Sequence, residues 1–133
     1  MRDGTAMDRW RRMIAAQGGD PAAPLPGARQ ALDIRAPRSG VLTRLDAFGV
    51  GVAAWRLGAG RALKEHAVDP GAGVEWFAVP GDPVSEGQVL LTLHSDDEHR
   101  FAGALEALTD AIVVGEPGEP VDRLPLVIDR VGS

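Results

Sequence analysis

The chain has 133 residues, of which 44% are apolar and 25% are charged, values typical of one compact globular domain rather than a disordered chain. Its net charge of −5 argues against nucleic acid or an anionic membrane as a partner, because both attract basic surfaces. The lack of cysteine excludes disulfides, thiolate metal sites and a cysteine nucleophile, and no apolar run predicts a membrane span or a signal core, so we expect a cytoplasmic protein.

A short helix is the first predicted element. Its apolar residues repeat at helical spacing on one face: Met7, Trp10, Met13 and Ile14. Thr5 and Asp8 resemble a capping pair at its start, and Gly18 and Gly19 before Pro21 predict its end. A helix of this length is marginal in water, so we expect its apolar face to be covered.

Proline and glycine divide the chain into three predicted segments. Residues 1–20 hold the helix, residues 21–30 form an extended linker, and residues 31–133 form the main domain. Within that domain, residues 32–36 and 41–46 predict two strands of a hairpin joined by a turn. Residues 48–57 predict a helix, because Phe48, Val52 and Trp55 recur at helical spacing.

The second half of the domain continues the mixture of strands and helices. Residues 73–79 and 89–94 predict strands separated by two turn clusters. Ser95 and Glu98 form a capping box, which predicts that a helix starts at Ser95. Its predicted buried stripe consists of Phe101, Leu105, Leu108 and Ile112. A loop at residues 115–120 and a last strand at residues 124–131 complete an α+β fold with antiparallel strands and two or three helices.

Gly58, Gly60 and Arg61 form the candidate anion site of this sequence. Two glycines allow backbone N–H groups to approach a phosphate, and an arginine can hold it by charge-assisted hydrogen bonds. The alternative is a tight turn after the helix, in which Arg61 pairs with a nearby carboxylate such as Glu65 or Asp69. The turn is favoured because the glycine pattern follows no strand and completes no dinucleotide fingerprint.

Other reactive residues are better explained by structure than by chemistry. His94, Asp96 and His99 are close enough in sequence for a metal site, but the capping box gives these positions to a strand end and a solvated helix start. The serines lie at turns, caps or the terminus, and none sits in a nucleophile elbow. We therefore predict no catalytic residue, no metal and no cofactor.

Several motifs, in order, resemble the C-terminal domain of the pyrimidine-nucleoside (thymidine) phosphorylases. They are Ala15–Pro21 (AAQGGDP), Ala36–Gly40 (APRSG), Ala54–Arg61 (AWRLGAGR), Lys64–Glu65, Gly81–Val84 (GDPV) and Leu93–Glu98 (LHSDDE). The resemblance runs from about residue 5 to 131. It implies a hammerhead fold similar to the barrel-sandwich hybrids of biotinyl and lipoyl carriers. Lys64 is not in the hairpin context that a carrier lysine needs, so we interpret it as a surface lysine.

The resemblance also implies the reaction of the parent enzyme. In that family phosphate attacks the anomeric carbon of thymidine or uridine, a glycosyl transfer of nucleoside salvage that gives the free base and (deoxy)ribose 1-phosphate. The phosphate loop and catalytic residues lie in a larger N-terminal portion, to which nothing here corresponds. The resemblance thus implies a non-catalytic domain of a homodimeric parent, joined to the N-terminal portion in cis or in trans. The alternative is a stand-alone interaction module that reuses the scaffold.

Overall fold

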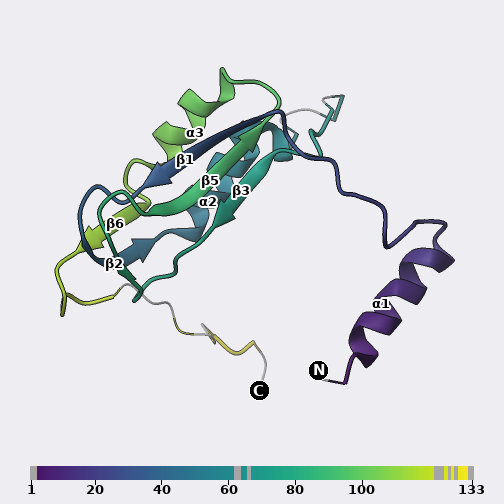
Figure 1. The fold of residues 1–133 in the computed structure, drawn as a ribbon, viewed down its shortest axis with the longest axis horizontal. Coiled ribbons are helices and arrows are strands. Elements are labelled where there is room, and N and C mark those ends of the chain that lie inside the picture. Colours follow the sequence, from purple (N-terminus) through teal and green to yellow (C-terminus); the bar gives the residue numbers. More distant parts are fainter. Residues whose placement is uncertain are drawn as a thin grey trace.

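The computed structural model describes residues 3–61, 64–65, 67–121, 125, 127 and 129–131. Its elements, in chain order, are α1 (Thr5–Ala16), β1 (Gln30–Arg35), β2 (Gly40–Leu45), α2 (Ala47–Ala54), η1 (Trp55–Ala59), β3 (Gly73–Trp76), β4 (Pro83–Val84), β5 (Val89–Ser95), α3 (Arg100–Leu108) and β6 (Ile112–Gly115). Figure 1 shows the strands gathered with α2 and α3, while α1 stands at the end of an extended segment. This is the α+β class that the sequence predicts, and within the described ranges neither sheet closes into a barrel.

The strands form two three-stranded antiparallel sheets, ordered β1-β5-β3 and β4-β2-β6. β1 pairs with β5 from Gln30 opposite Ser95 to Arg35 opposite Val89. The predicted hairpin of residues 32–36 with 41–46 is therefore wrong, because β1 and β2 lie in different sheets. The nearly continuous apolar run of β5 explains the outcome, since such a strand favours the sheet centre with a partner on each edge.

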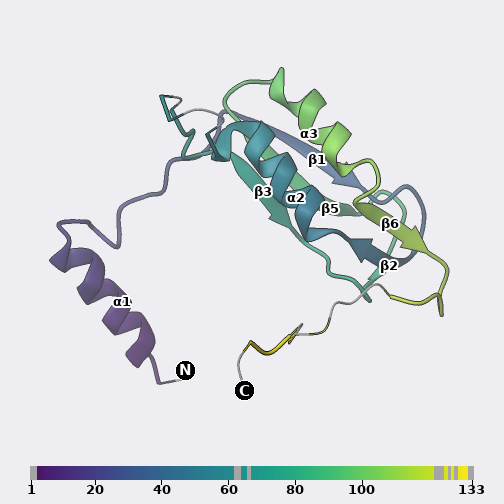
Figure 2. The same ribbon diagram turned by 180° about the vertical axis from the view of Figure 1, so that it is seen from behind.

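α2 and α3 cover the same face of the β1-β5-β3 sheet (Figure 2). Side chains alternate along a strand, so Leu91, Leu93 and Ser95 of β5 share one face, and all three are fully buried. Leu57 of η1 is also fully buried. Removing each leucine side chain from water contributes about 1.5–3 kcal/mol, so this layer holds the helices on the sheet.

The predicted helix at residues 48–57 is confirmed, with a capped start and a widened end. Asp46 caps α2, because its Oδ2 atom accepts a 2.7 Å hydrogen bond from the Gly49 amide. The chain then continues without a break into η1, a π-helical turn in which Gly58 leaves the helical conformation.

The capping box predicted at Ser95 is wrong. Ser95 is the last residue of β5, and its hydroxyl donates a 2.8 Å hydrogen bond to the Leu57 carbonyl oxygen. The helix begins five residues later, at Arg100. Asp97 forms the turn between them, because its Oδ1 atom accepts a 3.0 Å hydrogen bond from the His99 amide. Ser95 therefore belongs to the strand and bonds the Leu57 carbonyl oxygen, so it does not cap the helix.

The buried stripe predicted for this helix is also partly wrong. Leu108 is buried and Phe101 is half-buried, but Leu105 is 42% exposed, and Ala104 is fully buried in its place. Ile112 lies in β6, a strand that the periodicity did not predict. α3 ends at Leu108, so Ile112 lies beyond the helix and cannot belong to its stripe.

α1 is confirmed as a helix, but its start differs from the prediction: the N-cap residue is Gly4, and no side chain caps the helix. Asp3, rather than Thr5 with Asp8, serves the first turn: its Oδ1 atom accepts hydrogen bonds from the Thr5 hydroxyl and the Thr5 amide, which lower the pKa of Asp3. At the other end Gly18 has φ of 81°, and the Gly19 amide donates to the Ile14 carbonyl oxygen, as in a Schellman motif. No residue of α1 is buried.

The strand predicted at residues 124–131 lies mostly outside the described residues. The described positions there, residues 125, 127 and 129–131, belong to no strand. Of the helices in the described ranges, none is both long and apolar enough to cross a membrane.

Candidate functional site

Gly58 forms the sharp turn at the end of the α2–η1 helical segment. Its φ of 116° is one that L side chains rarely adopt, and a Cβ atom there would collide with the Arg100 guanidinium and lie 3.3 Å from Asp69 Cβ. The Gly58 carbonyl oxygen accepts a 3.0 Å hydrogen bond from the Asp69 amide. The backbone conformation therefore favours glycine here, and a side chain would also displace the Arg100 guanidinium.

A hollow of about 680 Å³ opens beside this turn. The residues that line it come from η1, α3 and the segments next to them: Trp55, Arg56, Gly58, Gly60, Ala67, His99, Arg100 and Gly103. Arg61 is not among them; its Nη1 atom lies 3.4 Å from the Lys64 carbonyl oxygen, to which it donates. The structure thus brings Gly58 and Gly60 together, but places Arg61 outside the hollow.

Sequence reasoning missed the two arginines of the hollow, Arg56 and Arg100. Arg56 Nη1 donates to the Gly103 carbonyl oxygen and to Glu106 Oε2, each at 2.7 Å. Arg100 Nη1 donates to the Leu57 carbonyl oxygen at 3.2 Å. Arg56 lay inside the sequence motif, but only the packing of η1 on α3 brings it near Arg100.

These contacts determine what the hollow does chemically. Arg100 Nε lies 3.7 Å from Asp97 Oδ2, and Arg56 is paired with Glu106, so protein carboxylates balance both cations. The arginines therefore tie η1 to α3, and an added anion would have to compete with these partners. The anion site proposed for Gly58, Gly60 and Arg61 stays a prediction.

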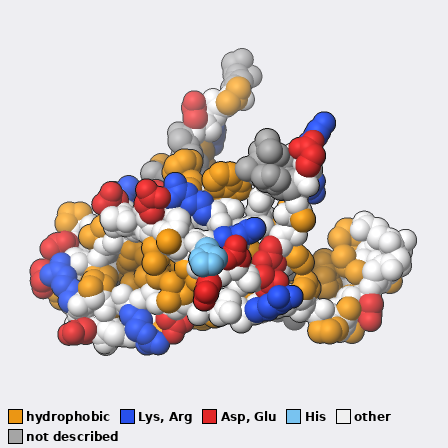
Figure 3. Space-filling view, turned by 90° about the horizontal axis from the view of Figure 1, so that it is seen from above, with side chains coloured by type: hydrophobic (Ala, Val, Ile, Leu, Met, Phe, Trp, Pro, Cys, Tyr) orange, Lys and Arg blue, Asp and Glu red, His pale blue; other side chains and the backbone are white. Residues whose placement is uncertain are grey.

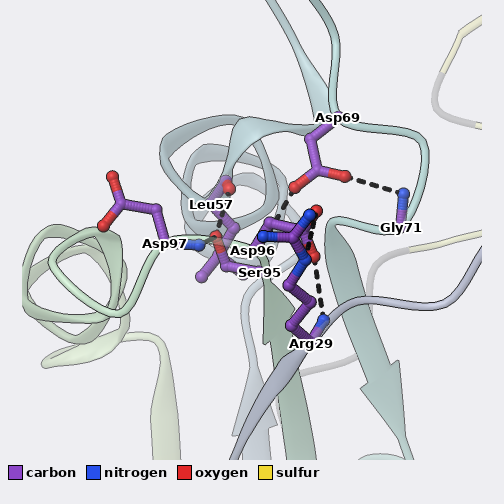
Figure 4. A network of polar contacts seen from close by, with 7 residues as sticks. All are labelled: Arg29, Leu57, Asp69, Gly71, Ser95, Asp96 and Asp97. Atoms are coloured by element: carbon purple, nitrogen blue, oxygen red, sulfur yellow. Dashed lines mark hydrogen bonds and ion pairs between the residues drawn. The ribbon is translucent and has the colours of Figure 1, made fainter.

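A second polar network joins the linker to the end of β5 (Figure 4). Asp96 Oδ1 accepts a 2.8 Å hydrogen bond from the Arg29 amide, and the Asp96 amide donates to Asp69 Oδ2 at 3.2 Å. Asp69 Oδ1 accepts from the Gly71 amide at 2.9 Å. Ser95 Oγ completes the group, because it donates to Leu57 and accepts from the Asp97 amide at 3.2 Å. The acidic residues here satisfy backbone N–H groups.

The three residues considered above and rejected as a metal site, His94, Asp96 and His99, have separate surroundings in the structure. His94 Nε2 lies 3.6 Å from Glu75 Oε2 across the sheet, Asp96 serves the Arg29 amide, and His99 lines the hollow. In the part of the chain that is described, no group of three His, Cys, Asp or Glu residues could hold a metal ion. Lys64 is an exposed lysine whose Nζ atom lies 3.7 Å from Glu65 Oε1.

Comparison with known proteins places the chain in a family. A profile of the "Pyrimidine nucleoside phosphorylase C-terminal domain" matches residues 41–115, more than half of the chain and nearly the whole span from β2 to β6. The chain belongs to this family. The match includes the Gly58 turn, both arginines of the hollow and the contacts of Ser95 with Leu57 and Asp97.

Curated relatives of this phosphorylase domain extend the similarity over nearly the whole chain. A thymidine phosphorylase of Mycobacterium tuberculosis (strain CDC 1551) is 44% identical over 98% of the chain. A thymidine phosphorylase of Burkholderia cenocepacia (strain HI2424) and a pyrimidine-nucleoside phosphorylase of Geobacillus stearothermophilus are each 37% identical, over 95% and 98% of the chain. The chain spans only 30–31% of the length of these relatives.

Proposed function

We propose that this chain is the non-catalytic C-terminal domain of a pyrimidine-nucleoside phosphorylase and works with an N-terminal catalytic portion, in cis or in trans. The observation that carries the proposal is the 44% identity over 98% of the chain to a thymidine phosphorylase, of which the chain spans only 30%. The parent reaction would be the phosphorolysis of thymidine or uridine to the free base and (deoxy)ribose 1-phosphate.

The chemistry of the described residues supports the non-catalytic part of this proposal. The arginines of the hollow are paired with carboxylates and carbonyl oxygens, and Ser95 is occupied by backbone groups. Phosphorolysis needs groups positioned to bind phosphate and to stabilise charge as the glycosidic bond breaks. Groups already engaged in holding the fold together are poorly suited to that task.

The proposal also covers the division of the chain into segments and the assembly and location of the complete enzyme. Residues 1–20 would be a helix shared with the preceding body, residues 21–30 a linker, and residues 31–133 the domain proper. The complete enzyme would be a cytoplasmic homodimer, as the family resemblance implies, and would need neither a cofactor nor a nucleic-acid or membrane partner.

A hybrid enzyme tests the function directly. The 133-residue chain alone, incubated with thymidine and phosphate, should release no thymine above a blank without protein. The same chain, joined to the body of the M. tuberculosis thymidine phosphorylase in place of the matching 30%, should release thymine. Thymine release by the chain alone, with contaminating enzyme excluded, would contradict the non-catalytic role. A folded but inactive hybrid would favour a stand-alone interaction module.

A further inference from the structure

An apolar hollow of about 360 Å³ lies between α2 and β3, away from the hollow of the arginines. Its walls include Val50, Gly51 and Ala54 of α2 and, on the other side, Val74, Trp76 and Val79. None of its lining residues carries a charge. We call this surface the α2–β3 face.

The α2–β3 face is unusually apolar for a surface in contact with water. Trp76 is 57% exposed, Val79 is 48% exposed and Phe48, in the first turn of α2, is 80% exposed. α2 itself, with the sequence AFGVGVAA, has no charged or polar side chain on any side. A helix that is apolar all round is normally buried all round, yet only Gly49 and Ala53 of α2 are buried here.

The opposite face of the same sheet carries polar and charged side chains. Thr92 Oγ1 donates a 2.8 Å hydrogen bond to Asp33 Oδ1, and Arg35 Nη2 donates a 2.7 Å hydrogen bond to Asp33 Oδ2. His94 lies beside Glu75 on neighbouring strands. Figure 3 views the domain from above Figure 1 rather than onto this face, and there acidic and basic side chains are interspersed with apolar ones. The two faces of this sheet therefore differ in polarity, and the α2–β3 face is the apolar one.

The length of the relatives indicates which partner could cover the α2–β3 face. The chain spans 30% of the thymidine phosphorylase that it matches at 44% identity, so about 70% of that protein lies outside the segment described here. A domain fixed to a larger body needs a contact surface, and apolar patches of this kind mark such interfaces. The N-terminal portion of a phosphorylase is therefore a partner of sufficient size that the family itself provides.

We propose that the α2–β3 face, centred on Trp76 and Val79, is the surface through which this domain packs against the N-terminal portion of the phosphorylase. The inference rests on the proposed function and adds an orientation to it. In the assembled enzyme the charged face of β1 and β5 would remain in water, and the all-apolar helix α2 would lie at the interface. Burial of Trp76 alone would remove one of the largest apolar side chains of the chain from solvent.

Hydroxyl-radical footprinting read by mass spectrometry tests the face residue by residue in the free 133-residue chain and in the hybrid enzyme. Oxidation of Trp76 should fall at least five-fold in the hybrid. Phe77, the next residue and 53% exposed, does not line the hollow and should change less than two-fold. Unchanged Trp76 oxidation in a hybrid that releases thymine would overturn the proposal while leaving the proposed function intact.

The remaining outcomes separate the two proposals. Protection of Trp76 in an inactive hybrid would support the face and contradict the parent activity. If Trp76 is protected in the free chain and light scattering shows a dimer, the face is occupied by a second copy and the proposal fails. Trp76→Gln should leave the thermal unfolding midpoint of the free chain within a few degrees of that of the unchanged chain. In the hybrid, Trp76→Gln should lower the thermal unfolding midpoint by more than the matched Phe77→Gln variant does. Equal effects of the two variants would also overturn the proposal.

Discussion

Ser95 offers the sharpest test of the local structure, because its side chain joins three parts of the domain. Its hydroxyl donates to the Leu57 carbonyl oxygen at 2.8 Å and accepts from the Asp97 amide at 3.2 Å, and the residue is fully buried. Ser95→Ala removes both hydrogen bonds. Arg100 still donates to the Leu57 carbonyl oxygen at 3.2 Å, so the Asp97 amide is the group left without this acceptor.

The expected cost follows from these contacts. A lost hydrogen bond costs about 0.5–1.5 kcal/mol, and a buried polar group without a partner costs about 1–3 kcal/mol, so we expect Ser95→Ala to lower the free energy of unfolding by about 2 kcal/mol. For a domain of this size, each kcal/mol shifts the thermal midpoint by about 4–8 °C, which gives a decrease of about 8–16 °C. Urea and thermal unfolding followed by circular dichroism would measure both quantities.

Two control variants separate this structure from the capping box that the sequence predicts. Glu98→Ala should change the free energy of unfolding by less than about 0.5 kcal/mol, because Glu98 is exposed and the side-chain contacts of the turn before α3 come from Ser95 and Asp97. Ser39→Ala is the comparison for an exposed serine, because it removes one exposed hydrogen bond, from the Glu86 amide to Ser39 Oγ at 2.9 Å. If Glu98→Ala costs as much as Ser95→Ala, or if Ser95→Ala is neutral, the assignment of the Ser95 network is refuted.

Four further changes test the rest of the domain. Leu108→Ala should cost about 2–5 kcal/mol in urea unfolding and the half-exposed Leu105→Ala less than about 1 kcal/mol, and the reverse order would refute the burial pattern of α3. Gly58→Ala should cost about 1–3 kcal/mol, since its φ of 116° strains any L side chain, whereas a neutral result in the same assay would rule out the turn. Deleting residues 1–28 should leave a cooperative melt shifted by only a few degrees, because no residue of α1 is buried, and loss of cooperativity would show that the helix belongs to the domain core. The lowered pKa of Asp3 means that the contact of its carboxylate with Thr5 is complete above the usual value of 3.8 and is lost as the pH falls through the lowered value. Amide exchange of Thr5 should therefore quicken there, and an unchanged rate, once corrected for intrinsic exchange, would contradict this contact.

The sequence predicted elements more reliably than their partners. α2 was found because three apolar residues repeat at helical spacing, and the end of α1 because Gly18 and Gly19 precede a proline, signals that act within a few residues. The pairing of β1 with β5 joins residues more than fifty positions apart and leaves no local trace in the partial alternation of β1. The prediction of a capping box was wrong for the same reason, because the Ser95 hydroxyl donates to the carbonyl oxygen of Leu57, which is distant in sequence.

In the candidate site, too, local features could be predicted from the sequence, whereas contacts between distant segments could not. Gly58 and Gly60 could be singled out from the sequence because glycine pairs mark turns that few other residues can form. Arg100 could not, since its guanidinium meets the turn only after η1 packs on α3. Arg61 is next to the glycines in sequence but donates to the Lys64 carbonyl oxygen instead, so nearness in the chain did not predict nearness in space.

The pairing of β1 with β5 has a consequence for how the chain acquires its structure. Neither sheet can be completed from neighbouring residues, because Gln30 pairs with Ser95 and Val41 with Gly115. On a ribosome, β1 cannot begin to pair until residue 89, the partner of Arg35, has left the exit tunnel, and it cannot pair along its full length before residue 95. The second sheet cannot be completed before β6 has emerged. Proteins dominated by such distant pairings fold slowly, in milliseconds to seconds. A nascent chain halted before residue 89 would therefore expose β1 and the apolar α2 together, and would be a natural client for chaperones during synthesis.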